Sequence, residues 1–126
     1  MMVVQEQVVI NLSDTFYIKQ NDSAPNIKAQ LKDAADNNIN LSAAEAVYFH
    51  MENKTTMELY LEKEAEIVNA ENGIVIYNWD RGDTSEHGTY ICEWMVDWGN
   101  DIVETFPNDD YNEVVITRQI AGVYEE

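Results

Sequence analysis

Apolar and polar residues alternate with a period of two along most of the chain, which is typical of strands that bury one face. The clearest example lies at 27–32, where Ile27, Ala29 and Leu31 alternate with polar residues. Similar alternation occurs at 8–12, 16–19, 47–52, 75–79, 90–97 and 113–117. This pattern predicts roughly seven to nine short strands.

The segment Met57–Glu71 fits two interpretations. As a helix it would place Met57, Leu61, Ala65 and Val68 on one side, with good helix formers between them. As a strand it would use the alternation around Leu61. We favour strand, because an Asn-Gly turn follows at once and a hairpin needs a partner strand upstream of its turn.

Turn residues separate the predicted strands. Asn72-Gly73 predicts a two-residue type I′ hairpin turn, and Trp98–Asp101 predicts a second hairpin loop. Asp33–Asn40 and Pro107–Asp110 are expected to be polar loops. Pro25 is expected at the beginning of a strand, where its missing N–H costs no ladder bond.

Short strands with regular turns in 126 residues predict a single all-β domain, an antiparallel β-sandwich. We place this domain at 1–120 and expect a loose C-terminal tail at 121–126. The sequence has no internal repeat, low-complexity tract or linker.

The chain is strongly acidic, with 24 acidic and 7 basic residues and a net charge of −17. A surface this negative repels phosphate groups, so we expect no nucleic-acid partner and no binding to an anionic membrane. Two interpretations of the acid excess remain open. It is either an adaptation to concentrated salt, in which screening suppresses self-repulsion, or an ordinary acidic surface.

Other partners and compartments are also limited by the sequence. No apolar run is long enough to span a membrane, and Met1–Gln7 lacks the pattern of a secretory signal. Cys92 is the single cysteine, so it can form neither an internal disulfide nor a cysteine-based zinc site. We expect it to be a small buried core residue.

The stretch Asp83–Cys92 resembles the corner before strand F of immunoglobulin-like domains, where Tyr-x-Cys begins an alternating strand. In that corner a tyrosine hydroxyl bonds back to the backbone. Here Tyr90 would make the bond, and its role would be structural.

The residues that are candidates for metal binding or catalysis do not form a recognisable motif in the sequence. His50 and His87 have no partner at metal-ligand spacing, and we expect both to face outward on a sheet. Asp80 with Asp83, and Asp109 with Asp110, are weak calcium candidates, since acidic residues are common in turns. No nucleophile elbow or phosphate loop is present, so we expect no enzyme, no catalytic or metal-binding residues and no cofactor.

Three further motifs are weak. Arg81-Gly82-Asp83 spells an adhesion tripeptide that also suits a turn. Trp79 and Trp94 fall on apolar faces, which leaves Trp98 as the tryptophan expected to be exposed and available to stack on a sugar. Glycosylation sequons begin at Asn11, Asn21, Asn40 and Asn53.

A series of short motifs between Asp14 and Thr117 resembles the N-terminal domain family of phage baseplate upper proteins. The matching pieces occur in the family's order. They are Ile18–Pro25, Leu31–Asp33, Asn40–Ser42, Val47–Met51, Gly73–Trp79, Gly82–Thr84, Gly88–Tyr90, Glu104–Asn108 and Tyr111. Asn21 stands where the family usually has glycine, and asparagine also tolerates a left-handed turn.

The resemblance implies an immunoglobulin-like β-sandwich that acts as a building block of a tailed virion. We therefore expect a tail or baseplate component that binds other virion proteins in symmetric homo-oligomers or many copies. The alternatives are a capsid decoration or turret protein, a carbohydrate- or cell-surface-binding module, and a calcium-dependent adhesion domain. The matching residues are expected to maintain the fold.

The two interpretations of the acid excess predict different responses to salt. If the chain is adapted to brine, its free energy of unfolding should fall as salt decreases below molar concentrations, because self-repulsion is then less screened. Thermal unfolding across a salt series measures this. Equal stability in dilute buffer would instead indicate an ordinary acidic surface.

Overall fold

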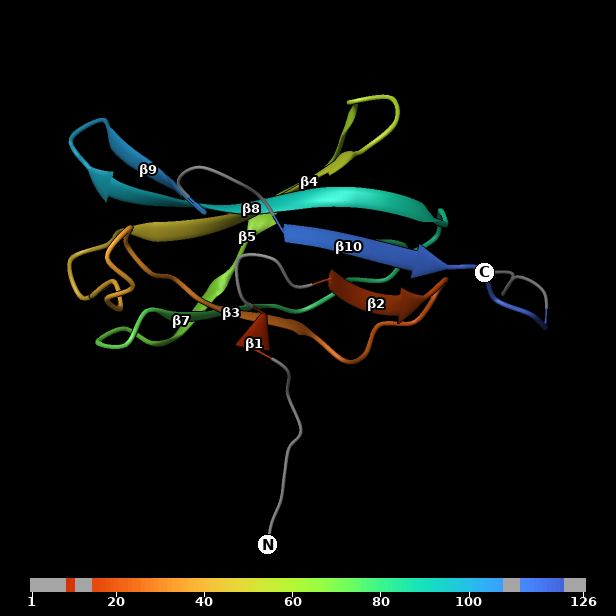
Figure 1. Ribbon diagram of the computed structural model, residues 1–126, viewed down its shortest axis with the longest axis horizontal. Coiled ribbons are helices and arrows are strands. Elements are labelled where there is room, and N and C mark those ends of the chain that lie inside the picture. The colour runs from red at the N-terminus through yellow and green to blue at the C-terminus, as the bar shows by residue number, and fades with distance from the viewer. Residues whose placement is uncertain (1–8, 11–14, 108–111, 122–126) are drawn as a thin grey trace, which may run out of the picture.

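The computed structural model describes residues 9–10, 15–107 and 112–121, and in these ranges it contains strands, turns and loops but no helix (Figure 1). The all-β prediction is therefore confirmed for this part of the chain. The strands are β1 (Val9–Ile10), β2 (Thr15–Lys19), β3 (Ile27–Gln30), β4 (Ala46–Asn53), β5 (Leu59–Glu64), β6 (Glu66–Asn69), β7 (Ile74–Tyr77), β8 (Gly88–Gly99), β9 (Ile102–Phe106) and β10 (Asn112–Thr117).

The strands form two sheets in separate layers (Figure 1). One sheet has the order β1-β3-β7-β6, and the other has the order β2-β10-β8-β4-β5 with β9 also paired to β8. The long strand β8 pairs with β10 along its first half and with β9 along its second half. Most pairs are antiparallel, but β1–β3 and β2–β10 are parallel, so the expectation of a purely antiparallel sandwich is wrong at these two pairs.

The predicted alternation decides which side chains lie between the sheets. Ile27, Ala29 and Leu31 are buried while the intervening Lys28 and Gln30 are partly exposed. The inward residues of β4, β8 and β10 are likewise buried. Burying a large apolar side chain contributes about 1.5–3 kcal/mol, so this one-sided pattern holds the two layers together.

An aromatic cluster joins the two layers. Phe49 of β4 stacks on Tyr77 of β7 with ring centroids 5.1 Å apart, and it also contacts Trp94 at 4.7 Å. Trp79, shortly after β7, packs edge-on against Phe49 at 5.9 Å. All four side chains are 5 % exposed or less, so the expected core positions of Trp79 and Trp94 are confirmed.

The ambiguous segment Met57–Glu71 contains strand and no helix, in agreement with the prediction, but it forms two strands. β5 belongs to the six-stranded sheet and β6 to the four-stranded sheet, so the chain passes from one layer to the other at Ala65. The Ala65 N–H donates to the Val47 carbonyl at 2.7 Å at this crossing. The crossing interrupts the period-two pattern, which explains why the sequence also fits a helix.

The hairpin at Asn72-Gly73 is present, but its predicted type is wrong. Four residues, 70–73, separate β6 from β7, and only Gly73 of the pair has a positive φ, at 70°. Asn100 and Asp101, between β8 and β9, both have positive φ, of 54° and 64°. The type I′ signature therefore occurs in the second predicted hairpin.

Gly73 is also constrained by close packing of the backbone. A Cβ at this position would lie 2.5 Å from the Ile39 carbonyl oxygen and 2.9 Å from that of Leu31. Gly73 thereby allows the 33–40 loop, which is polar as expected, to pack against the β6–β7 turn. Gly82 has a similar φ of 92°, but a Cβ there would meet open space, with no heavy atom within 4 Å.

We predict that Gly73→Ala destabilises the protein far more than Gly82→Ala. Both substitutions place alanine in the left-handed region, at a cost of about 1–2 kcal/mol. Gly73→Ala adds the steric conflict with two carbonyls, roughly a further 1–3 kcal/mol. Urea unfolding of the two variants measures the difference, and equal destabilisation would contradict the packing argument.

Candidate functional site

The best-organised polar cluster surrounds Asp83 in the loop that connects β7 to β8. Its carboxylate is only 5 % exposed. Oδ2 accepts the Tyr77 hydroxyl at 2.6 Å and the Asp80 N–H at 2.8 Å, while Oδ1 accepts Lys63 Nζ at 3.0 Å. A buried carboxylate is stable only with such partners, because burial removes its hydration.

These contacts also affect the ionisation of the two side-chain donors. Burial, followed by the hydrogen bond to Asp83, raises the pKa of Tyr77 well above its ordinary value of 10.0. The pKa of Lys63 is also raised, and here the hydrogen bond to Asp83 is the main cause. Tyr77 is therefore a neutral donor and Lys63 a cation around neutral pH, so neither is activated as a base or nucleophile.

Lys63 changes the interpretation of the proposed calcium pair. Asp80 and Asp83 do converge, as a calcium site would need, but both bind the Lys63 ammonium, at 3.2 and 3.0 Å. No local pattern in the sequence indicates this contact, because Lys63 lies on β5, 20 residues before Asp83. The lysine occupies the place where a cation would sit. Asp109 and Asp110 lie outside the described residues.

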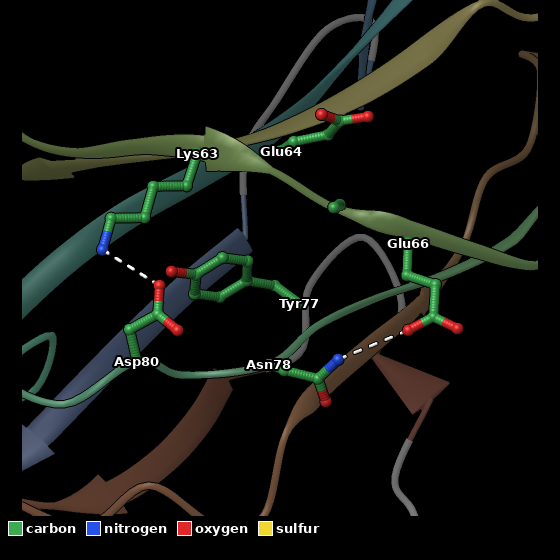
Figure 2. Close-up of a pocket in the computed structure, with 7 residues that line it drawn as sticks. Lys63, Glu64, Glu66, Tyr77, Asn78 and Asp80 are labelled. Atoms are coloured by element: carbon green, nitrogen blue, oxygen red, sulfur yellow. Dashed lines mark hydrogen bonds and ion pairs between the residues drawn. The ribbon is translucent and has the colours of Figure 1, made fainter.

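An open cleft of about 500 Å³ lies beside this cluster, where β5 leads into β6 and where the chain leaves β7. In Figure 2, Lys63 reaches across it to Asp80, and Asn78 points to Glu66. The Asn78 Nδ2–Glu66 Oε1 distance is 3.4 Å. Four of the polar groups that line the cleft, Lys63, Asp80, Asn78 and Glu66, thus bind one another in pairs, and the cleft has the character of a seam between the two sheets.

Several motif segments that are distant in sequence meet next to the Asp83 cluster. The buried Thr84 hydroxyl donates to the Asp22 carbonyl at 2.7 Å, and the Asn21 N–H donates to the Thr84 carbonyl at 3.0 Å. Trp79 Nε1 donates to the Pro25 carbonyl at 3.0 Å. The residues 20–25 and 77–85 are therefore fastened together at one end of the sandwich.

Tyr90 and Cys92 occupy the positions that the sequence predicts. The Tyr90 hydroxyl donates to the Glu86 carbonyl at 2.7 Å, which is the bond of a tyrosine corner. Cys92 is a free, buried thiol. Burial raises the pKa of this thiol far above its ordinary value, so it is unsuited to act as a nucleophile.

The two histidines lie apart. His87 is exposed, but it lies in the β7–β8 loop and not on a sheet as expected. His50 faces outward from β4 between two glutamates of neighbouring strands, with Glu93 Oε2 at 3.5 Å and Glu62 Oε2 at 3.7 Å. Among the described residues, no group of three or more histidine, cysteine or acidic side chains is arranged to hold a metal ion.

Trp98 is less accessible than expected. It is partly buried against the core, and its Nε1 donates to Glu104 Oε1 at 3.2 Å. The Arg81-Gly82-Asp83 tripeptide is not displayed as a unit, because Asp83 is buried while its two neighbours are exposed. Neither feature forms a ready-made recognition site.

The sequon asparagines that the structure describes take part in turns. The side-chain oxygens of Asn40 and Asn53 accept backbone N–H groups two residues ahead, at 2.9 Å in each case. Asn21 adopts a left-handed φ of 72°, as its place in the motif suggests. Asn11 lies outside the described residues.

The chain matches no family model and no curated protein. Within the described residues there is also no helix of the length and apolar character that crossing a membrane requires.

We predict that Asp83→Asn lowers the free energy of unfolding by about 2–3 kcal/mol, because it removes a buried charge that accepts three hydrogen bonds. Asp80→Asn is the matched control. Its carboxylate contacts the same lysine but is 67 % exposed, and exposed ion pairs contribute about 0–1 kcal/mol. Urea unfolding compares the two, and equal losses would show that the buried carboxylate has no special role.

Proposed function

We propose that this protein is a structural component of a tailed virion, in the tail or baseplate, and that its fold is an immunoglobulin-like sandwich. It acts by binding other virion proteins in several symmetric copies. Capsid decoration is the alternative position in the particle and would use the same surfaces.

The sheet orders support the fold assignment. Immunoglobulin domains place strands A, B, E and D in one sheet and G, F, C and C′ in the other. The order β1-β3-β7-β6 corresponds to A-B-E-D, and β10-β8-β4-β5 corresponds to G-F-C-C′. Tyr90 and Cys92 then lie on strand F, where a tyrosine corner belongs. The parallel β1–β3 pair departs from the scheme.

The observation that carries the proposal is the contact between motif segments. The pieces that resemble the phage family at 18–25, 73–79 and 82–84 are separate in sequence, yet they bond to each other around Asp83 and Thr84. The matched segments therefore belong to one connected structural unit of this fold. Their polar atoms are also used within the fold, which supports a module whose function lies on its surface and not in a catalytic centre.

Purified virus particles from the organism that makes this chain test the proposal. We expect mass spectrometry to find the chain in the particles at a fixed copy number, and a labelled antibody to mark the tail or its end in electron micrographs. Labelling over the head would select the capsid alternative. Absence of the chain from the particles would refute a virion role.

A further inference from the structure

The outward surface of the six-stranded sheet combines apolar and acidic side chains in a regular pattern. We call this surface the outer face, and define its apolar part by residues on β2, β4, β8, β9 and β10. These residues are Tyr17, Tyr48, Ile91, Met95, Val103 and Val115. Tyr17 is 64 % exposed and Val103 is 56 % exposed, while the others are partly exposed.

The register of the strands sets the pattern on this face. His50 is paired with Glu62 on one side and Glu93 on the other, which makes an acidic row across three strands. On one side of this row Tyr48 is paired with Met95. On the other side Ile91 lies between carboxylates, paired with Glu52 of β4 and Glu113 of β10.

Tyr48 with Met95, and Tyr17 with Val115, are adjacent apolar pairs. On an ordinary protein surface, exposed apolar residues are mostly single and scattered. The glutamates beside His50 lie between the apolar pair Tyr48–Met95 and the single apolar residue Ile91, which fits a partner that carries lysine or arginine flanked by apolar groups. The aliphatic stems of such residues pack on Tyr48, Met95 and Ile91 while their charged ends reach the glutamates. Charged groups of opposite sign also fix the register of such an interface.

Charge distinguishes between possible occupants. A second copy of this chain carries the same net charge of −17 and would place one row of glutamates against another. Like charges brought together at an interface oppose association. The complementary occupant is therefore a different, basic polypeptide.

We propose that the outer face is the docking surface for a basic protein, with Glu62 and Glu93 as its central charged contacts. The inference rests on the proposed function, because it takes this protein to be another virion component, and it adds the chemistry of that partner.

Carbodiimide cross-linking tests this inference in the cells and particles that contain the chain, since the reagent joins a carboxylate to a contacting lysine. We expect Glu62 or Glu93 to be linked to a lysine of a different polypeptide. The double variant Glu62→Gln/Glu93→Gln should lose the link without a change in melting temperature. Asp36→Asn, which neutralises an exposed carboxylate in the 33–40 loop and outside the face, should retain it.

Hydroxyl-radical oxidation of the same material gives a second readout that does not need a lysine. Met95 of the chain in cells and particles should be oxidised severalfold more slowly than Met95 of the isolated protein. Met57, which is 72 % exposed on the β4–β5 connection, serves as the reference for accessibility.

The outcomes separate this inference from the proposed function. A link from Glu62 or Glu93 to a lysine of a protein that is not part of a virion would support the docking surface and refute the virion role. Links only to another copy of the chain would refute the basic partner. Unchanged oxidation of Met95, or links spread evenly over exposed carboxylates such as Asp36 and Glu71, would refute the docking surface even if the chain is present in particles.

Discussion

The buried carboxylate of Asp83 imposes the strongest single requirement on this structure. A charge removed from water must be compensated by donors held in place, or the fold loses stability. Tyr77 supplies one donor from β7, Lys63 another from β5, and the Asp80 backbone a third. The β5–β6 crossing and the β7–β8 loop must therefore approach each other at this point, where the chain connects the two sheets.

This requirement explains why the residues that look most suited to chemistry serve the fold. The acidic pair, the adhesion-like tripeptide and the tyrosine motif all lie in or beside the β7–β8 loop, and each contributes contacts that close one end of the sandwich. Under the proposed function, recognition uses surfaces whose side chains do not make these internal contacts. The outer face of the six-stranded sheet is one such surface, and its register follows directly from strand pairing.

Much of the architecture could be predicted from the sequence, because period-two alternation directly encodes which side of a strand is buried. The positions of Ile27, Phe49, Trp94 and Val114 in the core follow from it.

Turn type is harder to predict, since Asn-Gly indicates a type I′ turn only if the strands pair up to those two residues. The β6–β7 pair ends earlier, at Asn69 and Ile74, which leaves a four-residue loop. The contact of Lys63 with Asp83 could not be predicted, because it depends on how the end of β5 and the β7–β8 loop approach each other in space. The outer face could not be predicted for a similar reason, as its pattern exists only across strands.

Amide hydrogen exchange in wild-type protein and Asp83→Asn tests most directly whether this carboxylate holds the end of the sandwich together. The informative amides are Asn21, bonded to Thr84, and Leu31, bonded to Gly73 beyond the far end of β3. We predict that the variant exposes the Asn21 and Asp80 amides to faster exchange together, under conditions in which Leu31 keeps its protection. If Asn21 retains wild-type protection while only Asp80 changes, Asp83 acts locally and the central claim is wrong.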